Sequence, residues 1–307
     1  MPLVKPLPMD EERSSGALGR GFTRAGLGLL WLVSRLPWRL QRSLAAAAGW
    51  TVFHLAPVRR HVTLVNLRVC FPEFTEKERR LLARRHYQSL VLGGLESARC
   101  WWRGPEELPA FRIEGLESLE RARARGRGVI VVSGHFTTLE IAGRMLAWRT
   151  RLCCLYRDPN NAVIADLLRR HRTEWAARAI EMRDVAGLVR ALRDGEAVWY
   201  APDQGKWTPQ SLTLPFFGRP AITNPSTARL AQMTGAAVLT FFASRLEDGT
   251  YVLKLSEPLE NFPSDDPAAD TCRLTKMLED AIRAVPEQYL WVHQRFKGRR
   301  GLPVSPY

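Results

Sequence analysis

The stretch Gly128-Val-Ile-Val-Val-Ser133, continued by Gly134-His-Phe-Thr-Thr-Leu-Glu140, decides how this chain is organised. An unbroken apolar run of this length, closed by a glycine, is typical of a strand that is buried on both faces. After Gly134 the pattern changes to a helical spacing through Ile141 and Met145. The stretch therefore predicts a strand, a tight turn that carries His135, and a helix.

Two residues of this unit have the chemistry of a catalytic pair. A histidine in such a turn can act as a general base, and a carboxylate can orient it. Residues five apart do not face each other on one helix, so the pair requires His135 in the turn and Glu140 inside the helix. A buried histidine with a purely structural role fits the same residues. From this segment alone both interpretations stay open.

The chain around this unit alternates between strand and helix patterns. Strands are expected at 128–133, 152–156, 196–201 and 236–245, and helices at 137–149, 161–177, 184–194 and 225–234. Glu247-Asp-Gly249 is typical of a hairpin turn into Tyr251–Ser256, which adds antiparallel pairing. Earlier, Thr75-Glu-Lys-Glu78 is a capping box that opens a long helix to about Trp102. The sequence thus predicts an α/β fold, with a mixed central sheet flanked by helices.

Polar residues follow two further predicted strands. Arg157 comes after strand 152–156 and Asp203 after strand 196–201, so parallel strands would bring both to the edge that carries His135. Arg157 suits a phosphate or carboxylate ligand, or an ion pair with Asp158. Asp203 suits three roles, which are to orient a base, to hold a hydroxyl or to cap its loop.

Three other segments are ambiguous. The apolar residues between Trp207 and Thr223 indicate a loop that forms either a ligand channel or ordinary core. Arg170 and Arg172 belong to a charge run on a helix, which is usually a solvated face. The C-terminal stretch 286–297 mixes aromatics with cations and suits binding of nucleic acid or lipid headgroups, or a structural latch.

Composition narrows the partners. Lys and Arg number 45 against 31 Asp and Glu, a net charge of +14, which favours acidic partners such as an anionic membrane, a phosphorylated lipid, an acidic protein or nucleic acid. No recognised nucleic-acid-binding module is present. The five cysteines form no disulfide framework and no metal-ligand spacing.

The N-terminal region predicts membrane association without a span. Residues 1–20 resemble a disordered segment and lack the pattern of a secretory signal. Ala25–Ser34 and Ser43–Val58 are apolar but too short to cross a bilayer, and Pro37 separates them. Flanking arginines favour helices lying in an anionic interface, with a buried helical hairpin as the alternative. We therefore expect a membrane-associating helical segment at 21–60 and a single α/β domain at 61–307.

Taken together, several motifs resemble the late (secondary) acyltransferases of lipid A biosynthesis, and the resemblance covers about residues 25–307. The motifs are Arg59-Arg60, Asn66-Leu67, Cys70-Phe-Pro-Glu73, Ser133-Gly-His-Phe-Thr-Thr-Leu-Glu140, Tyr156-Arg157, Val198-Trp-Tyr-Ala-Pro-Asp203, Pro215-Phe-Phe-Gly218, and Pro286-Glu-Gln-Tyr-Leu-Trp291 with His293, Arg295, Phe296 and Lys297. In one departure, Lys206 and Trp207 replace an acidic, Tyr-Gly-containing stretch that usually follows Asp203 in the family.

The resemblance implies a glycerolipid-acyltransferase-like fold and acyl transfer from acyl carrier protein to a hydroxyacyl chain of a Kdo2-lipid IVA-type precursor. It implies His135 as general base, Glu140 as its orienting carboxylate, and backbone N–H groups at the start of helix 137–149 as oxyanion donors. Arg157, Arg170, Arg172 and Asp203 would bind the substrate. No metal or bound cofactor is implied, and the expected location is the cytoplasmic face of a bacterial inner membrane.

Two alternatives compete with this expectation. One is a related acyltransferase that uses acyl-CoA and another membrane glycolipid, such as a phosphatidylinositol mannoside. The other is a basic membrane or nucleic-acid adaptor in which His135 is structural. Loss of turnover in a His135→Ala variant would separate an enzyme from an adaptor.

Overall fold

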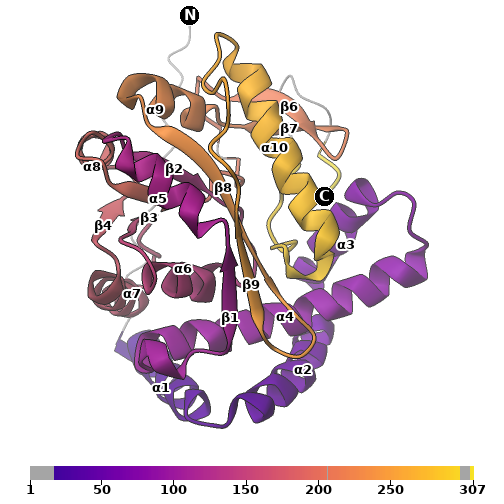
Figure 1. Ribbon diagram of the computed structural model, residues 1–307. Helices are drawn as coiled ribbons and strands as arrows, with labels where there is room; N and C mark the ends of the chain where they lie inside the picture. Colours follow the sequence, from indigo (N-terminus) through magenta and orange to yellow (C-terminus); the bar gives the residue numbers. More distant parts are fainter. Residues whose placement is uncertain (1–16, 206, 298–304) are drawn as a thin grey trace, which may run out of the picture.

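The computed structural model describes residues 17–205, 207–297 and 305–307. Within them, seven strands form one sheet in the order β1-β9-β8-β2-β5-β3-β4, drawn in Figure 1. The strands are β1 (Phe111–Glu114), β2 (Val129–Val132), β3 (Cys153–Tyr156), β4 (Arg178–Glu181), β5 (Ala197–Tyr200), β8 (Ala237–Arg245) and β9 (Tyr251–Leu255). All neighbours are parallel except β8 and β9, which are antiparallel. The expectation of a mixed sheet is confirmed.

Helices cover both faces of the sheet. They are α5 (Leu116–Ala124), α6 (Leu139–Ala147), α7 (Ala162–Trp175), α8 (Val185–Arg193), α9 (Ser226–Thr234) and α10 (Pro267–Ala284). Successive residues of β2 point to opposite faces. Val129 and Val131 therefore pack in the cluster with α5 and α6, and Ile130 and Val132 in the one with α8, α9 and α10. This explains why all four residues of β2 are apolar and buried.

The connections that follow β2 and β5 run in opposite directions along the sheet and pass each other on opposite faces. The chain leaves β2 through α6 towards β3 on one side, and leaves β5 through α9 towards β8 on the other. Because crossover connections are right-handed, opposite directions put α6 and α9 on opposite faces. Where the connections of neighbouring strands leave towards opposite faces, a crevice can form at the carboxyl ends, and ligands of open α/β sheets bind there. This crevice is where the structure places His135.

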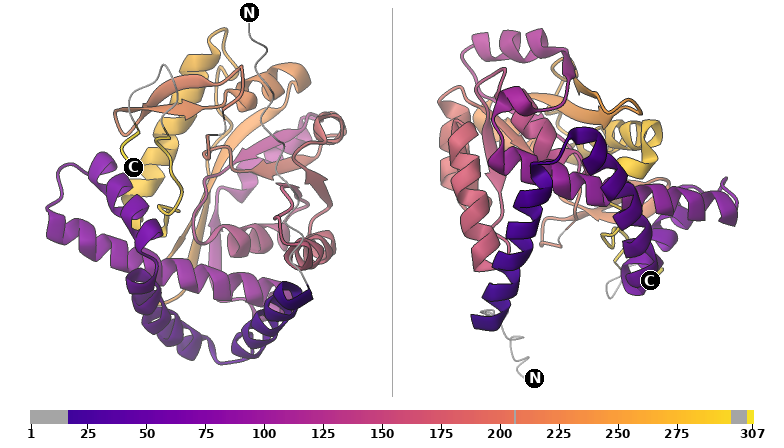
Figure 2. Two further views of the ribbon diagram at one scale, coloured as in Figure 1. Left: turned by 180° about the vertical axis from the view of Figure 1, so that it is seen from behind. Right: turned by 90° about the horizontal axis from the view of Figure 1, so that it is seen from below.

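Four N-terminal helices lie at the end of the sheet where β2 and β5 have their carboxyl ends. They are α1 (Ala17–Ser34), α2 (Trp38–Leu55), α3 (Pro57–Cys70) and α4 (Glu76–Trp102), and the views from behind and below show α4 between the sheet and the α1–α2 pair (Figure 2). Thr75 and Glu78 form the predicted capping box of α4. No helix in the described ranges combines the length and apolarity that crossing a membrane requires.

Two expectations need correction. Helix α1 begins at Ala17, so residues 17–20 are helical; residues 1–16, also expected to be disordered, lie outside the described residues. The segment expected as an apolar loop contains a hairpin, β6 (Leu212–Phe216) and β7 (Arg219–Thr223). Its turn residues Phe217 and Gly218 both have positive φ, at 49° and 72°. This is the geometry of a two-residue hairpin turn, which the prolines of both strands obscure in the sequence.

Candidate functional site

The loops after β2 and β5 bring His135 and Asp203 together. Val132 and Tyr200 are partners in the β2–β5 ladder, and each of the two polar residues follows its strand end by three positions. Because β2 and β5 are adjacent and parallel, residues that follow the two strand ends by the same number of positions lie close together. His135 and Asp203 therefore lie at the same point of the crevice. The sequence-based expectation that carboxyl strand ends gather the site is met by this pair.

A chain of hydrogen bonds links three side chains there. Nδ1 of His135 lies 2.5 Å from Oδ1 of Asp203, and the backbone N–H of His135 donates to Oδ2 at 3.1 Å. The hydroxyl of Tyr289 also donates to Oδ2, at 2.9 Å. Because Nδ1 donates its proton to the carboxylate, Nε2 of the neutral imidazole is left as the basic nitrogen. The His135 side chain is 28% exposed and that of Asp203 only 1%, so the histidine is the accessible member of the pair.

Electrostatics of the pair follow from this geometry. Burial alone would lower the pKa of His135, but the charge of Asp203 and the hydrogen bond to it raise that pKa above 6.5. Burial likewise favours the protonated form of Asp203, yet His135 and the donated hydrogen bonds hold the pKa of this carboxyl below 3.8. Burial and the neighbouring carboxylate raise the pKa of Tyr289, which stays a neutral donor. Asp203 is thus a charged partner matched to an imidazolium.

The C-terminal segment 286–297 supplies Tyr289 and acts as the structural latch. The N–H of Leu290 donates to the carbonyl of His135 at 2.9 Å, and the N–H of Thr137 donates to the carbonyl of Gln288 at 2.7 Å. Behind it, Nδ2 of buried Asn66 donates to the carbonyls of Trp291 and His293, at 2.7 and 2.8 Å. Tyr289, Trp291, Arg295 and Phe296 of this segment are buried, as a latch requires, and Lys297 is exposed.

The loop that carries Asp203 is held from the other side. A β-carbon on Gly205 would come within 2.0 Å of the carbonyl oxygen of Ile222 on β7, so this position requires glycine. The guanidinium of Arg295 donates to that same carbonyl at 2.7 Å and to the Thr223 hydroxyl at 3.0 Å. The β6–β7 hairpin and the latch therefore fix the Asp203 loop together. Lys206, part of the departure from the family pattern, lies outside the described residues.

Glu140 has a different partner from the one expected. Its Oε2 accepts from Nη2 of Arg172 at 3.1 Å, joining α6 to α7, and its Oε1 is buried without a hydrogen-bond partner in the described part of the chain. Within that part, no hydrogen bond or ion pair joins Glu140 to His135. The carboxylate that is hydrogen-bonded to the imidazole is Asp203. Glu140 lies inside α6 and its side chain is paired with Arg172 on α7, which explains why it is not bonded to His135.

The three predicted substrate arginines are not equivalent. Arg172 is mostly buried in its pair with Glu140. Arg170 is exposed on α7 and pairs with Asp166 at 2.7 Å. Arg157 is exposed beside the end of β3, at the sheet edge that carries His135. Of the three, Arg157 has the position expected of a substrate contact, and Arg172 is held in the ion pair that joins α7 to α6.

Two features escaped the sequence analysis. Tyr289 was part of a motif but had no assigned role, and only a fold that returns the C-terminus to β2 gives it one. In addition, two amides at the start of the predicted helix 137–149 are already occupied, since Thr137 donates to Gln288 and Leu139 to Phe136. The hydroxyl of Thr138 donates to Ala243 instead of capping α6. Those two amides are therefore not free to act as oxyanion donors.

Comparison with known proteins supports a single kind of chemistry. The family model described as bacterial lipid A biosynthesis acyltransferase matches residues 9–298. The chain is 32% identical to the lipid A biosynthesis lauroyltransferase of Escherichia coli K12 over 286 residues, 92% of this chain and 94% of the relative. It is 34% identical to the palmitoleoyltransferase of the same strain, over 91% and 92% of the two chains, and 24% identical to the myristoyltransferase, over 92% and 88%.

Proposed function

Since this chain belongs to the bacterial lipid A biosynthesis acyltransferase family, we propose that it moves a fatty acyl chain from acyl carrier protein to a hydroxyacyl chain of a Kdo2-lipid IVA-type precursor. The relatives are named for lauroyl, palmitoleoyl and myristoyl transfer, so the donor carries a long acyl chain. The observation that carries the proposal is the His135–Asp203–Tyr289 hydrogen-bond chain in the crevice between β2 and β5.

In the proposed reaction, Nε2 of His135 removes the proton of the acceptor hydroxyl as its oxygen attacks the thioester carbonyl. The imidazolium that forms is stabilised by Asp203, whose other oxygen is held by Tyr289. The tetrahedral intermediate then collapses, the C–S bond breaks, and the thiolate takes the proton back from Nε2. The products are an ester and the free thiol of the carrier, and no metal or cofactor takes part in any step.

Oxyanion stabilisation is assigned to the first turn of α6. The amides of Glu140 and Ile141 belong to this turn, and the Thr138 side chain does not cap them. A helix N-terminus adds a partial positive charge, which favours a developing oxyanion nearby. The Glu140–Arg172 pair serves this turn indirectly, because it fixes α6 against α7.

Charge supports acyl carrier protein as the donor, since a chain with net charge +14 attracts an acidic protein at long range. Acyl-CoA is the competing donor. Initial rates with acyl carrier protein and CoA thioesters of the same chain length separate the two, because a docking surface for the protein lowers KM for its thioester alone.

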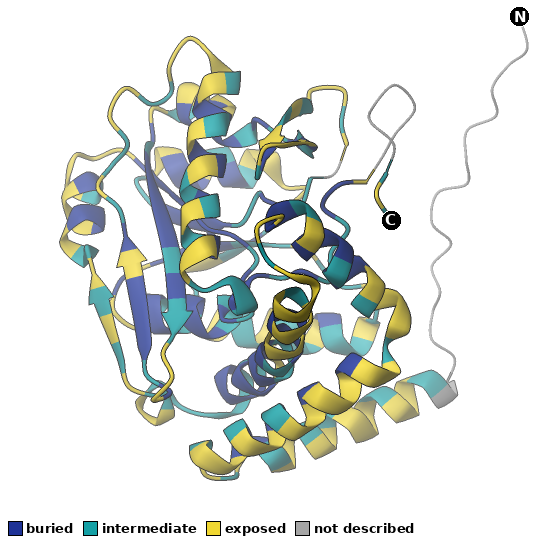
Figure 3. Ribbon diagram, turned by 90° about the vertical axis from the view of Figure 1, so that its right-hand side faces the viewer, coloured by how far each residue is buried: buried dark blue, intermediate teal, exposed yellow. Residues whose placement is uncertain are grey.

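Exposed apolar residues of α1 and α2 support attachment to the cytoplasmic face of the inner membrane. In the described part of the chain, ten of the seventeen exposed large apolar side chains fall between Phe22 and Val58. Figure 3 shows these two helices largely exposed along one side of the molecule. Arginines at both ends of the apolar segments suit an anionic leaflet. A variant with Leu29, Leu32 and Leu55 changed to serine should move from the membrane to the soluble fraction; if it stays bound, the attachment lies elsewhere.

The direct test is an acyl-transfer assay with purified protein, a pool of acyl-carrier-protein thioesters and Kdo2-lipid IVA, read by mass spectrometry beside a His135→Ala variant. A single acyl mass gain, absent in the folded variant, establishes reaction, acceptor and chain length together. If the wild-type protein gives no product with this acceptor but acylates another glycolipid, the acceptor assignment is wrong and the enzyme class stands.

A further inference from the structure

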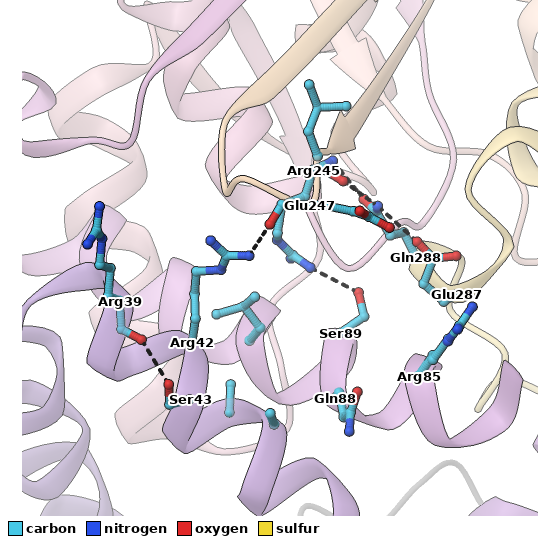
Figure 4. A pocket seen from close by; sticks show the side chains of 14 residues that line it. Arg39, Arg42, Ser43, Arg85, Gln88, Ser89, Arg245, Glu247, Glu287 and Gln288 are labelled. Carbon is cyan, nitrogen blue, oxygen red and sulfur yellow. Dashed lines mark hydrogen bonds between the residues drawn. The ribbon is translucent and has the colours of Figure 1, made fainter. Parts of the chain in front are cut away.

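A cavity of about 680 Å³ lies between α2, α4, the β8–β9 turn and the short helix η2 (Pro286–Gln288), and His135 is not among its lining residues. Figure 4 shows its polar side chains coming from all of these elements. Four arginines line it, two from α2 and one each from α4 and β8, namely Arg39, Arg42, Arg85 and Arg245. They outnumber the two lining carboxylates, Glu247 and Glu287. Hydroxyl and amide groups complete the polar lining, from Ser43, Gln88, Ser89 and Gln288.

Arg245 is the fixed element of this cavity. Its side chain is only 8% exposed, with Nε paired to Glu96 at 2.5 Å and Nη1 donating to the Ser89 hydroxyl at 3.1 Å. Its Nη2 is buried and has no hydrogen-bond partner among the described residues. A buried guanidinium nitrogen without a partner is costly, and an anionic oxygen that reaches it removes that cost.

The other arginines are arranged around this buried donor. Arg42 is held by the backbone carbonyls of Glu247 and Asp248, so the β8–β9 turn fixes its guanidinium. Arg39 and Arg85 are exposed, and neither guanidinium has a hydrogen-bond or ion-pair partner within the described ranges. The two side chains can therefore bind a ligand without first breaking an existing ion pair or hydrogen bond. A planar guanidinium donates two parallel hydrogen bonds to a phosphate, which makes arginine the preferred residue for this group.

Apolar residues around the cavity favour the phosphate of a lipid over free inorganic phosphate. Ala45, Ala46, Leu92 and Leu246 give the cavity apolar walls. On α2, Leu40 and Leu44 directly follow the lining residues Arg39 and Ser43, and their side chains are 45% and 41% exposed. An apolar strip beside a basic cavity suits a ligand that is charged at one end and oily at the other.

We propose that this cavity binds the phosphate headgroup of an anionic membrane lipid, with the acyl chains lying over α2. The site is separate from the reacting groups but adjoins them. Ser89 hydrogen-bonds the Thr137 hydroxyl at 2.7 Å, and the carbonyl of Gln288 accepts from the Thr137 N–H. A bound headgroup therefore rests against the residues that support the His135 turn. The inference does not rest on the acyl-transfer reaction.

Isothermal titration of the full chain, in a neutral detergent, with dihexanoyl phosphatidic acid tests the proposal. The cavity variant is Arg39→Gln with Arg85→Gln. Its control is Arg125→Gln with Arg127→Gln, which removes the same charge from the exposed loop before β2, at the opposite edge of the sheet. All four positions are exposed, so unchanged thermal unfolding is expected.

We expect saturable binding that is at least tenfold weaker in the cavity variant and unchanged in the control. Equal affinity in both variants overturns the site, as does binding of zwitterionic dihexanoyl phosphatidylcholine with the same affinity. A competition experiment with inorganic phosphate separates a lipid site from a free-phosphate site. If inorganic phosphate displaces the lipid at an equal concentration, the cavity is a free-phosphate site. Leu40→Ser with Leu44→Ser should weaken the lipid and leave inorganic phosphate unaffected. These experiments measure binding and not catalysis, so their outcome does not depend on which lipid is the acyl acceptor.

Discussion

Gly93 of α4 lies directly against Thr137 in the turn that carries His135. A β-carbon at position 93 would come within 2.3 Å of the Thr137 carbonyl oxygen, far inside contact distance. One turn earlier on the same helix, Ser89 bonds the Thr137 hydroxyl. Helix α4 thus holds the turn that carries His135 by one close backbone contact and one hydrogen bond.

Gly93→Ala should therefore displace the turn. We expect the free energy of unfolding to fall by about 1–3 kcal/mol from overpacking and kcat to fall about tenfold to a hundredfold from a misplaced base. Gly94→Ala is the matched control, since its added carbon meets no atom within 4 Å. That variant should be more stable by about 0.5–1 kcal/mol, with unchanged kcat. Equal activity in the two would show that the turn tolerates displacement.

Asp203→Asn should lower kcat about 10³–10⁴-fold, as expected when a base loses its orienting charge. It should also move the acid limb of the kcat/KM profile to lower pH. The carboxylate raises the pKa of His135, and without it burial remains, which lowers that pKa. Tyr289→Phe keeps the charge and should leave the limb close to its wild-type position, with a smaller loss of rate. An acid limb that does not move in Asp203→Asn would mean that another group titrates.

Glu140→Gln tests the other carboxylate. Arg172 would be left mostly buried without its counter-ion, so we expect unfolding to become easier by about 1–3 kcal/mol and kcat to fall. The acid limb should stay in place, because Glu140 does not act on the pKa of His135. Asp166→Asn, which breaks the exposed pair with Arg170 on α7, should change stability by less than about 0.5 kcal/mol. A shifted limb in Glu140→Gln would make Glu140 the orienting residue.

The His135–Asp203 pair should also make stability depend on pH. Asp203 has a lowered pKa in the folded state, so its contribution is present above pH 3.8 and lost as pH falls through the folded value. His135 has a raised pKa, so its contribution is present below pH 6.5 and lost as pH rises through the folded value. The difference in thermal unfolding between wild type and a His135→Gln/Asp203→Asn double variant should be largest between these pH values. A difference that does not change with pH would exclude an ion pair.

Much of the sheet is predictable because its central strands are short apolar runs bounded by glycine and polar residues, as in β2 and β5. The edge strand β4 (Arg178–Glu181) was not predicted because two of its four residues are charged. The hairpin of β6 and β7 was missed because Pro215 and Pro220, which are paired across it, are unusual in strands.

Two residues of the site could be predicted from the sequence, but their pairing could not, because the pairing depends on the order of strands in the sheet. His135 and Asp203 could each be placed at a carboxyl strand end, but nothing in the sequence states that β2 and β5 are neighbours. Without that fact, Glu140 was the nearest carboxylate along the chain. Tyr289 lies still further away in sequence, and its role depends on long-range packing of the latch against Asn66 and Thr137.

The latch also sets when during its own synthesis the protein acquires its site. His135, Asp203 and the sheet beneath them leave the ribosome well before residues 286–297, which supply Tyr289 and hold the His135 turn. Contacts between segments so distant in sequence form late in folding. The nascent polypeptide therefore carries His135 and Asp203 without their final support until translation of the latch is complete.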